Sequence, residues 1–283
     1  MPNKSFSLYN LDGNVTIDER DQLVLEIGKS HIACILKEES KQTIAAFELF
    51  LFKEEEALDF KKLFNIISAD SKLLASPNSG ARVFINNPVC IPVPIFKFNK
   101  DIAEDYLNLV YANDPLATTL YDNIAIEPGI MNIFRVNKKC LSALNLYLPR
   151  VTFHHTYSNI IKSLVQAMPL GNPAEFMSVN FFNAFIIVTV FKDNKLNLIQ
   201  TFIYETHEDV LYHLLNISER FKLRIDKLIL KISGMIDLDF GLYREMIKYF
   251  KEVSVENVST ANISLNINEH PLHYFTPFFN LAT

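Results

Sequence analysis

The sequence contains no tryptophan, only seven glycines and only three cysteines among its 283 residues. The cysteines, Cys34, Cys90 and Cys140, are odd in number and far apart in the chain. This spacing is typical of reduced thiols in a cytoplasmic protein, and it disfavours a disulfide framework or a cysteine-ligated metal site.

Long apolar segments are also missing. No run of about 18 apolar residues occurs, so the sequence predicts no membrane-spanning helix. The first residues, MPNKSFSLYNLDGN, are too polar for the apolar region of a secretory signal. We therefore expect a cytoplasmic protein.

Basic residues are too few for a nucleic-acid-binding surface. The formal net charge is −5 and the pI is about 5.8, whereas non-specific binding to nucleic acids depends on clustered Lys and Arg. We therefore expect no nucleic-acid partner. Apolar residues, in contrast, make up 49% of the chain and include its 23 phenylalanines, which is ample for the cores of two α/β halves.

Residues 21–52 and 175–206 carry the same pattern. Each reads as a strand, a short break, a second strand, a polar turn and a third strand, and the copies align without a gap up to that turn when Glu26 is placed opposite Asn180. Helix and strand patterns follow each copy, so the second half is predicted to run βββ, α, β, α, β. The repeat indicates a duplicated α/β domain.

The remaining patterns set the limits of the two predicted halves. We expect residues 1–20 to form a loose polar arm, residues 21–170 the first half and residues 171–283 the second half. The segment near 87–136 is interpreted as an elaboration of the first half, and the turn sequence at 170–173 as the connection between the halves.

Local signals predict individual elements. Apolar spacing predicts a helix over 56–74, and three prolines confine residues 87–96 to an edge strand or an extended crossover. Thr206 and Asp209 have the spacing of a capping box and are expected to open a helix. A short strand is predicted at 263–265.

The duplicated βββαβα order resembles the actin-like ATPase fold, which is related to the ribonuclease H fold. The proline-rich segment IPVPIF and the C-terminal sequence HPLHYFTPFFNLAT sharpen this resemblance. Together they are similar to a bacterial family of uncharacterised domains with that fold, over essentially the whole chain. The layout is more distantly similar to the bacterial actin homologues of cell division and type IV pilus assembly.

The resemblance implies where a nucleotide site would lie. The first hairpin of an actin-like ATPase carries Asp-x-Gly and a small hydroxyl residue, because the acid organises Mg²⁺ through water and the glycine lets backbone N–H groups approach phosphate. The matching residues here are Glu26, Gly28, Lys29 and Ser30, which is a partial match.

The other implied positions match less well. The second hairpin should repeat Asp-x-Gly, but Asn180 replaces the acid and the bulky Phe182 replaces the glycine. A late strand should end in a Gly-Gly turn, and Ser233 with Gly234 keeps only one glycine. The nucleotide site is therefore interpreted as degenerate.

Other catalytic and metal-binding patterns are missing. No G-x-S-x-G elbow or P-loop occurs. His154 and His155 are adjacent in a predicted strand, so their side chains should point to opposite faces. His270 and His273 have no cysteine or obvious carboxylate partner to complete a zinc site. We predict no catalytic residue and no metal site.

Aromatic residues gather near the end of the chain. Tyr274, Phe275, Phe278 and Phe279 lie close together in the sequence. They are interpreted first as residues that pack the last element onto the sheet. The alternative is a docking patch for a partner, since exposed apolar clusters mark interfaces.

These patterns lead to two hypotheses about function. In the first, the chain is a non-catalytic actin-like protein without a cofactor that binds an unidentified protein partner, and a homo-oligomer is compatible with it. In the alternative, it is a divergent Mg-ATP-binding protein, ATPase or sugar-kinase-like, in which Lys29 and Ser30 contact phosphate. Phe182 separates them. A ring in the place of a phosphate would weaken the alternative, whereas a ring that points into the core and leaves an open polar cleft would favour it.

Overall fold

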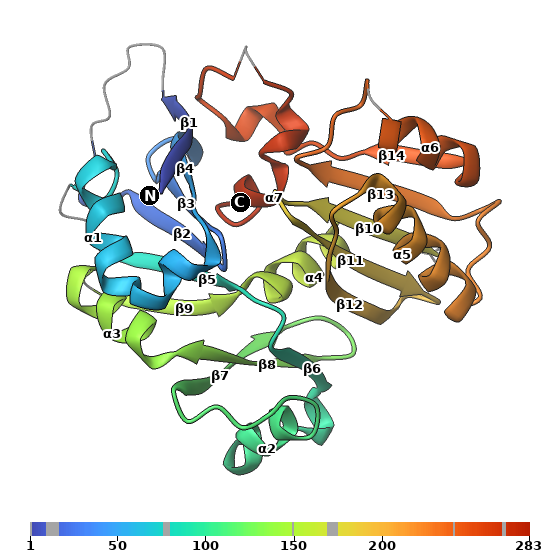
Figure 1. Ribbon diagram of the computed structural model, residues 1–283, viewed down its shortest axis with the longest axis horizontal. Helices are drawn as coiled ribbons and strands as arrows, with labels where there is room; N and C mark the ends of the chain where they lie inside the picture. The colour runs from blue at the N-terminus through green and yellow to red at the C-terminus, as the bar shows by residue number, and fades with distance from the viewer. Residues whose placement is uncertain are drawn as a thin grey trace. The chain divides into compact units, whose positions relative to one another are not determined.

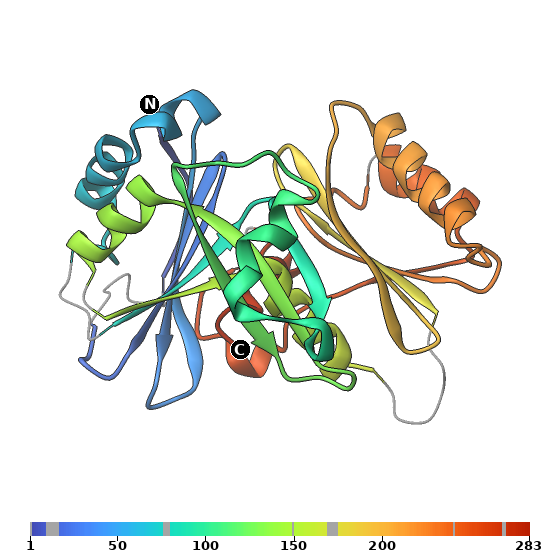
Figure 2. The same ribbon diagram turned by 90° about the horizontal axis from the view of Figure 1, so that it is seen from below.

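The computed structural model describes residues 2–9, 17–75, 80–148, 150–168, 175–239, 241–267 and 270–283. Residue contacts divide the chain into two units, each built around its own sheet (Figures 1 and 2). The first unit comprises Met1–Lys162, Ser259–Ile267 and Leu281–Thr283, and the second comprises Ser163–Val258 and Asn268–Asn280. The predicted connection at 170–173 lies outside the described residues.

The first unit contains a six-stranded sheet with the order β1-β4-β3-β2-β5-β9. Strands β1, β4, β3 and β2 pair antiparallel, whereas β5 and β9 continue the sheet in parallel. The strands span Asn3–Tyr9 (β1), Gln22–Gly28 (β2), His31–Glu38 (β3), Thr43–Leu51 (β4), Ala81–Asn86 (β5) and Val151–His155 (β9). The middle strands β2 and β3 are buried along most of their length, which explains why apolar residues occupy both of their faces.

Two helices of the first unit lie side by side, α1 (Phe60–Asp70) and α3 (Lys138–Tyr147), as Figure 2 shows. The predicted helix over 56–74 was too long. A 3₁₀ helix, η1 (Glu54–Asp59), precedes α1, and the Asp59 side chain caps α1 by accepting the N–H of Lys62. No helix in the described ranges is long and apolar enough to cross a membrane.

The segment that was interpreted as an elaboration forms a separate three-stranded sheet with the order β6-β8-β7. Its strands are β6 (Cys90–Pro94), β7 (Ala117–Ile124) and β8 (Ile130–Asn137), and α2 (Ala103–Asn108) packs on it with its own small core. Strand β6 lies at the edge, where its prolines need not donate to a second neighbour.

The second unit contains a five-stranded sheet with the order β12-β11-β10-β13-β14. Its strands span Phe176–Phe181 (β10), Phe185–Lys192 (β11), Lys195–Ile203 (β12), Ile229–Gly234 (β13) and Glu252–Val255 (β14). Helices α5 (His207–Arg220) and α6 (Gly241–Tyr249) pack on it with an apolar core. The predicted capping box is present, since the Thr206 side chain accepts the N–H of Asp209.

The predicted duplication is confirmed at the level of single residue pairs. Both units repeat an antiparallel meander followed by two parallel strands, and the first unit adds β1 at its edge. In the first meander Glu26 pairs with Ala33, and in the second Asn180 pairs with Ile187, so the aligned positions have the same register. The fold is therefore a duplicated α/β fold, as the sequence predicts.

Strand β1 corrects the prediction of a loose arm over residues 1–20. Residues 3–9 pair antiparallel with β4, and two of their side chains bind the buried carboxylate of Glu48. Lys4 Nζ lies 3.2 Å from Glu48 Oε1, and Tyr9 Oη donates to the same oxygen at 2.5 Å. Residues 10–16 of the predicted arm lie outside the described residues.

The predicted strand at 263–265 is also wrong. Ile263 makes only an isolated bridge to Ile44, and the N–H of Ser264 donates to the carbonyl of Ile44. The segment thus contacts the first unit without extending its sheet.

The Tyr9–Glu48 contact predicts a dependence of stability on alkaline pH. Burial, followed by the hydrogen bond and charge of Glu48, raises the pKa of Tyr9 above its ordinary value. The unfolded chain therefore loses this proton first, so the stabilisation is complete below about pH 10 and falls as the pH rises further. Urea unfolding at pH 8 and at about pH 10.5 should show a smaller alkaline loss for Tyr9→Phe than for the wild type.

Tyr212→Phe is the matched control, because Tyr212 is 65% exposed. Equal alkaline losses in the wild type and in Tyr9→Phe would contradict the prediction.

Candidate functional site

The first hairpin places Glu26 inside the protein. Glu26 belongs to β2 and is 0% exposed, whereas Gly28 ends that strand and Lys29 is exposed in the turn that follows. The acid and the glycine of the partial motif are thus in the expected order at the end of a central strand.

Both oxygens of the Glu26 carboxylate are bound by protein groups. Asn86 Nδ2 donates to Oε1 at 3.2 Å, and Thr156 Oγ1 donates to the same oxygen at 2.7 Å. His31 Nε2 lies 2.9 Å from Oε2. A buried carboxylate is costly unless it is paired and hydrogen-bonded, and these three side chains meet that need.

His31 also fills the space over Gly28. A Cβ atom added at Gly28 would lie 2.2 Å from Cε1 of the His31 ring, and His31 itself is 3% exposed. The glycine is therefore required for the packing of this imidazole.

Lys29 faces a hollow within the first unit. The hollow has a volume of about 350 Å³, and Gly28, Asn86 and Lys139 are among its lining residues. Of the predicted first-hairpin residues, Gly28 and Lys29 are thus brought to a cavity, whereas Glu26 is turned away from solvent.

The second hairpin brings Asn180, Ser233 and Gly234 together. Asn180 and Ser233 are paired across the parallel strands β10 and β13, and Ser233 Oγ donates to Asn180 Oδ1 at 2.9 Å. Gly234 has a φ of +94°, and an added Cβ would lie 2.1 Å from the Phe181 carbonyl oxygen. The N–H of Met235 donates to that same oxygen at 2.9 Å, which fixes the turn.

Phe182 is a core residue of the second unit. It is 2% exposed, and its ring stacks on that of Phe185 with 4.7 Å between centroids. It also forms an edge-on pair with the ring of Phe278, with 5.6 Å between centroids. Its N–H donates to the carbonyl of Phe185 at 2.9 Å. At this position both the ring and the backbone donor are used inside the unit.

The docking patch considered for the C-terminal aromatics is not supported. Phe275, Phe278 and Phe279 are at most 1% exposed, and only Tyr274 is partly exposed. The segment folds into η5 (Leu272–Tyr274) and α7 (Thr276–Phe279), whose rings pack against each other and against Phe182. These aromatic rings belong to the core, the simpler of the two interpretations made from the sequence.

The adjacent histidines point to different environments, as predicted. The His154 ring is partly exposed and its Nδ1 lies 3.1 Å from Asp122 Oδ1. His155 is 0% exposed, with Nε2 3.0 Å from the Asn87 carbonyl and Nδ1 accepting the N–H of Tyr157 at 3.1 Å. Burial lowers the pKa of His155 to about 4, although the bond to Asn87 and the charge of Asp122 act in the opposite direction.

The described ranges contain no group of three or more His, Cys, Asp or Glu residues that could hold a metal ion. His273, one of the two histidines considered above for a zinc site, is instead placed against the backbone, with Nε2 2.9 Å from the carbonyl oxygen of Ile236. Burial raises the pKa of the Cys90 and Cys140 thiols, and that of Cys140 reaches about 12. Buried protonated thiols are poor nucleophiles and poor metal ligands.

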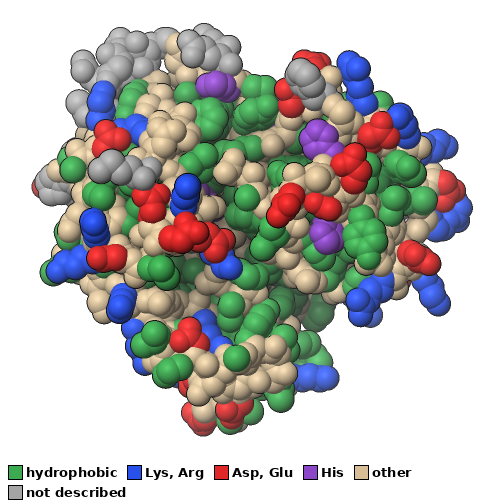
Figure 3. Space-filling view, in the orientation of Figure 1, with side chains coloured by type: hydrophobic (Ala, Val, Ile, Leu, Met, Phe, Trp, Pro, Cys, Tyr) green, Lys and Arg blue, Asp and Glu red, His purple; other side chains and the backbone are tan. Residues whose placement is uncertain are grey.

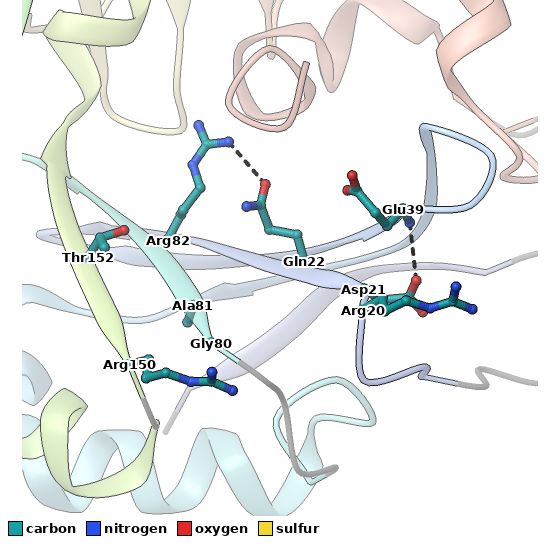
Figure 4. A pocket seen from close by; sticks show the side chains of 9 residues that line it. All are labelled: Arg20, Asp21, Gln22, Glu39, Gly80, Ala81, Arg82, Arg150 and Thr152. Carbon is teal, nitrogen blue, oxygen red and sulfur yellow. Dashed lines mark hydrogen bonds between the residues drawn. The ribbon is translucent and has the colours of Figure 1, made fainter.

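A second hollow of about 530 Å³ lies at the opposite ends of the parallel strands, where Arg20, Arg82 and Arg150 contribute to its lining. Figure 4 shows that Arg82 extends to one side of the sheet and bonds to Gln22, whereas Arg150 lies on the other side and Arg20 points away. Because these guanidinium groups do not converge, the hollow does not form a site for a single anion.

Sequence reasoning missed the partners of Glu26. His31 follows it by five positions, and the spacing gives a contact only because the turn at residues 29–30 places β3 against β2. Asn86 ends β5, which lies on the other side of β2, and it pairs with Gly28 at the same end of β2. Thr156 comes from the first residue of α4 (Thr156–Gln166), and no local signal in the sequence relates it to Glu26.

This architecture is that of proteins with an actin-like ATPase fold. A Bacteroides thetaiotaomicron protein with that fold and unknown function is similar with a TM-score of 0.75 and 17% identity, over 86% of this chain and 94% of that one. A chain in the PilM–PilN type IV pilus biogenesis complex has a TM-score of 0.58 and 11% identity, over 94% and 97%. EutJ, an ethanolamine utilization protein from Carboxydothermus hydrogenoformans, has a TM-score of 0.51 and 9% identity, over 96% and 93%.

The chain belongs to the family described as protein of unknown function DUF3822, whose model matches residues 12–253. The resemblance to a family of unknown function with an actin-like fold is thereby confirmed. No curated protein matches the chain.

The buried His155 predicts a loss of stability in acid. Its pKa is about 4 in the folded protein and about 6.5 when exposed, so only the unfolded chain gains a proton between these values. The stabilisation is present above about pH 6.5 and is lost as the pH falls towards 4, by up to roughly 3 kcal/mol. His155→Gln should be less stable than the wild type at pH 8. Its free energy of unfolding should fall less than that of the wild type between pH 7 and about pH 4.5, as measured by urea unfolding. An equally large fall in the free energy of unfolding for the variant and the wild type would contradict this prediction.

The turn after β13 predicts that Gly234→Ala is strongly destabilising. The positive φ and the contact with the Phe181 carbonyl oxygen together should lower the free energy of unfolding by about 2 kcal/mol or more. Gly241→Ala is the matched control in the same unit, because its Cβ would meet only the His207 side chain, at 3.3 Å. Chemical denaturation that finds both variants equally stable would exclude the strained turn.

Proposed function

We propose that this protein is a non-catalytic member of the actin-like group and that it acts by binding a protein partner. The observation that carries the proposal is the state of the Glu26 carboxylate, whose two oxygens are bound by His31, Asn86 and Thr156. An acid that organises Mg²⁺ through water needs free oxygens beside solvent. Glu26 is 0% exposed and is used to join elements of its own unit.

The second unit supports the same conclusion. Asn180 brings no charge to the position where an acid is expected, and its oxygen accepts from Ser233. Phe182 brings a buried ring to the position where a glycine is expected, and its N–H is bonded within the hairpin. A backbone donor that is already bonded is not available to phosphate.

Partner binding is compatible with this fold. A chain with a similar fold belongs to the PilM–PilN type IV pilus biogenesis complex, which is an assembly of proteins. The exposed apolar side chains of the first unit offer a surface for such a role, since Phe96, Leu58 and Leu109 are each more than 75% exposed.

One observation favours the alternative of Mg-ATP binding. Lys29 is exposed beside Gly28 and faces a hollow, as a phosphate-binding lysine would. The alternative must supply a carboxylate for the metal from elsewhere, because Glu26 is already bonded.

Calorimetric titration of Mg-ATP and Mg-ADP into the full chain separates the two functions. We expect no saturable heat up to millimolar nucleotide. Lys29→Glu and Lys227→Glu are the matched variants, since both lysines are exposed and lie in different units. Micromolar binding that is lost in Lys29→Glu and kept in Lys227→Glu would overturn the proposal in favour of nucleotide binding.

A further inference from the structure

Two adjoining hollows lie along η1, α1 and α3 in the first unit. One has a volume of about 350 Å³ and the other of about 640 Å³, and Leu58, Phe60 and Lys139 line both. The hollows therefore form one groove, whose walls come from the start of α1 on one side and from α3 on the other. The groove lies wholly within the first unit.

Apolar side chains in this groove are left in solvent. Leu58 is 78% exposed, Leu146 is 70% exposed and Leu116 is 61% exposed. The apolar stripe of α1, in contrast, points into the core, with Phe60, Leu63, Phe64 and Ile67 buried. The exposed leucines are thus not needed to attach the helices to the sheet, and a cluster of this kind marks an interaction site.

The groove carries positive charge on a protein that is acidic as a whole. Lys29, Lys61, Lys138 and Lys139 line it, whereas the chain has a net charge of −5. Asp59 is the one carboxylate in the lining, and it caps α1. Lys138 Nζ donates to the Pro115 carbonyl, and among the described residues none of the four ammonium groups forms an ion pair with a carboxylate.

We propose that this groove binds an acidic amphipathic helix of a protein partner, with apolar side chains of the helix against the leucines and its carboxylates beside the lysines. The proposal rests on the proposed protein-binding function and names the chemistry of the partner. Helix-in-groove binding uses apolar anchors at i, i+3, i+4 and i+7, and opposite charges on the rim fix register and partner choice.

The shape of the surface favours a helix over a membrane. The leucines line hollows of several hundred Å³, and a hollowed surface suits the convex face of a helix better than a flat bilayer. Figure 3 shows Lys and Arg side chains, together with Asp and Glu, interspersed with hydrophobic ones on the side of the first unit where α1 and α3 lie.

The test uses the full chain and a synthetic peptide of about 16 residues, with leucines on one helical face and glutamates on its flanks. Fluorescence anisotropy of the labelled peptide should show saturable binding. A peptide of the same composition in scrambled order, and one with lysine in place of glutamate, should each bind at least about tenfold more weakly.

Matched variants assign the binding to the groove. Leu58→Asp and the double variant Lys61→Glu, Lys139→Glu should weaken binding about tenfold or more. Ile247→Asp and Lys227→Glu are the controls, because Ile247 is 50% exposed and both residues lie in the second unit. The controls should bind within about twofold of the wild type. Circular dichroism of each variant checks that it is folded.

Three results would overturn the proposal. The first is equal binding of the ordered and scrambled peptides, or no binding at all. The second is co-sedimentation with phosphatidylglycerol vesicles that Leu58→Asp abolishes, which would assign the groove to a membrane surface. The third is a concentration-dependent dimer in sedimentation velocity that Leu58→Asp dissolves, which would assign it to a second copy of the chain.

Failure of this proposal can be told apart from failure of the proposed function. If the nucleotide titrations give no saturable heat and the peptide does not bind, the proposal for the groove is wrong and the non-catalytic interpretation remains. Saturable nucleotide binding that depends on Lys29 would remove the proposed function, whatever the peptide does.

Discussion

A buried carboxylate at the end of a central strand constrains the first unit. Glu26 has no exposed surface, and its partners come from the strand beside it, from the parallel strand on its other side and from the helix that follows β9. Removing any one partner would leave a buried carboxyl group short of a hydrogen bond, which is unfavourable. The carboxylate therefore fixes the hairpin turn, the end of β5 and the start of α4 relative to one another, and Gly28 follows from this because His31 needs the space above it.

The second unit reaches the same register without a charge. Asn180 occupies the position of Glu26, but it is paired by one hydroxyl, that of Ser233 on the adjacent parallel strand. The following turn is then fixed by Gly234, whose positive φ brings Met235 back to the Phe181 carbonyl. Two copies of one topology thus stabilise equivalent strand ends by different means, a hydrogen-bonded carboxylate in one and an amide–hydroxyl pair with a glycine turn in the other.

The sequence predicted those parts of the structure that depend on local or repeated patterns. The meander repeat, the capping box at Thr206 and the edge position of the proline-rich strand all depend on nearby residues, and all are present. Strand β1 was missed because its partners lie about forty positions away on β4, where Lys4 and Tyr9 bind the buried carboxylate of Glu48. The cluster around Glu26 was missed for the same reason, since Thr156 lies 130 positions from it.

The aromatic end of the chain shows why composition alone could not separate core from surface. Four aromatic residues in six positions suit either an interface or an interior, and the outcome depends on what covers them. Phe182 supplies part of that cover, since its ring packs against the ring of Phe278 in α7. Phe182 is therefore a packing residue, and glycine in its place would open a hole in the core of the second unit.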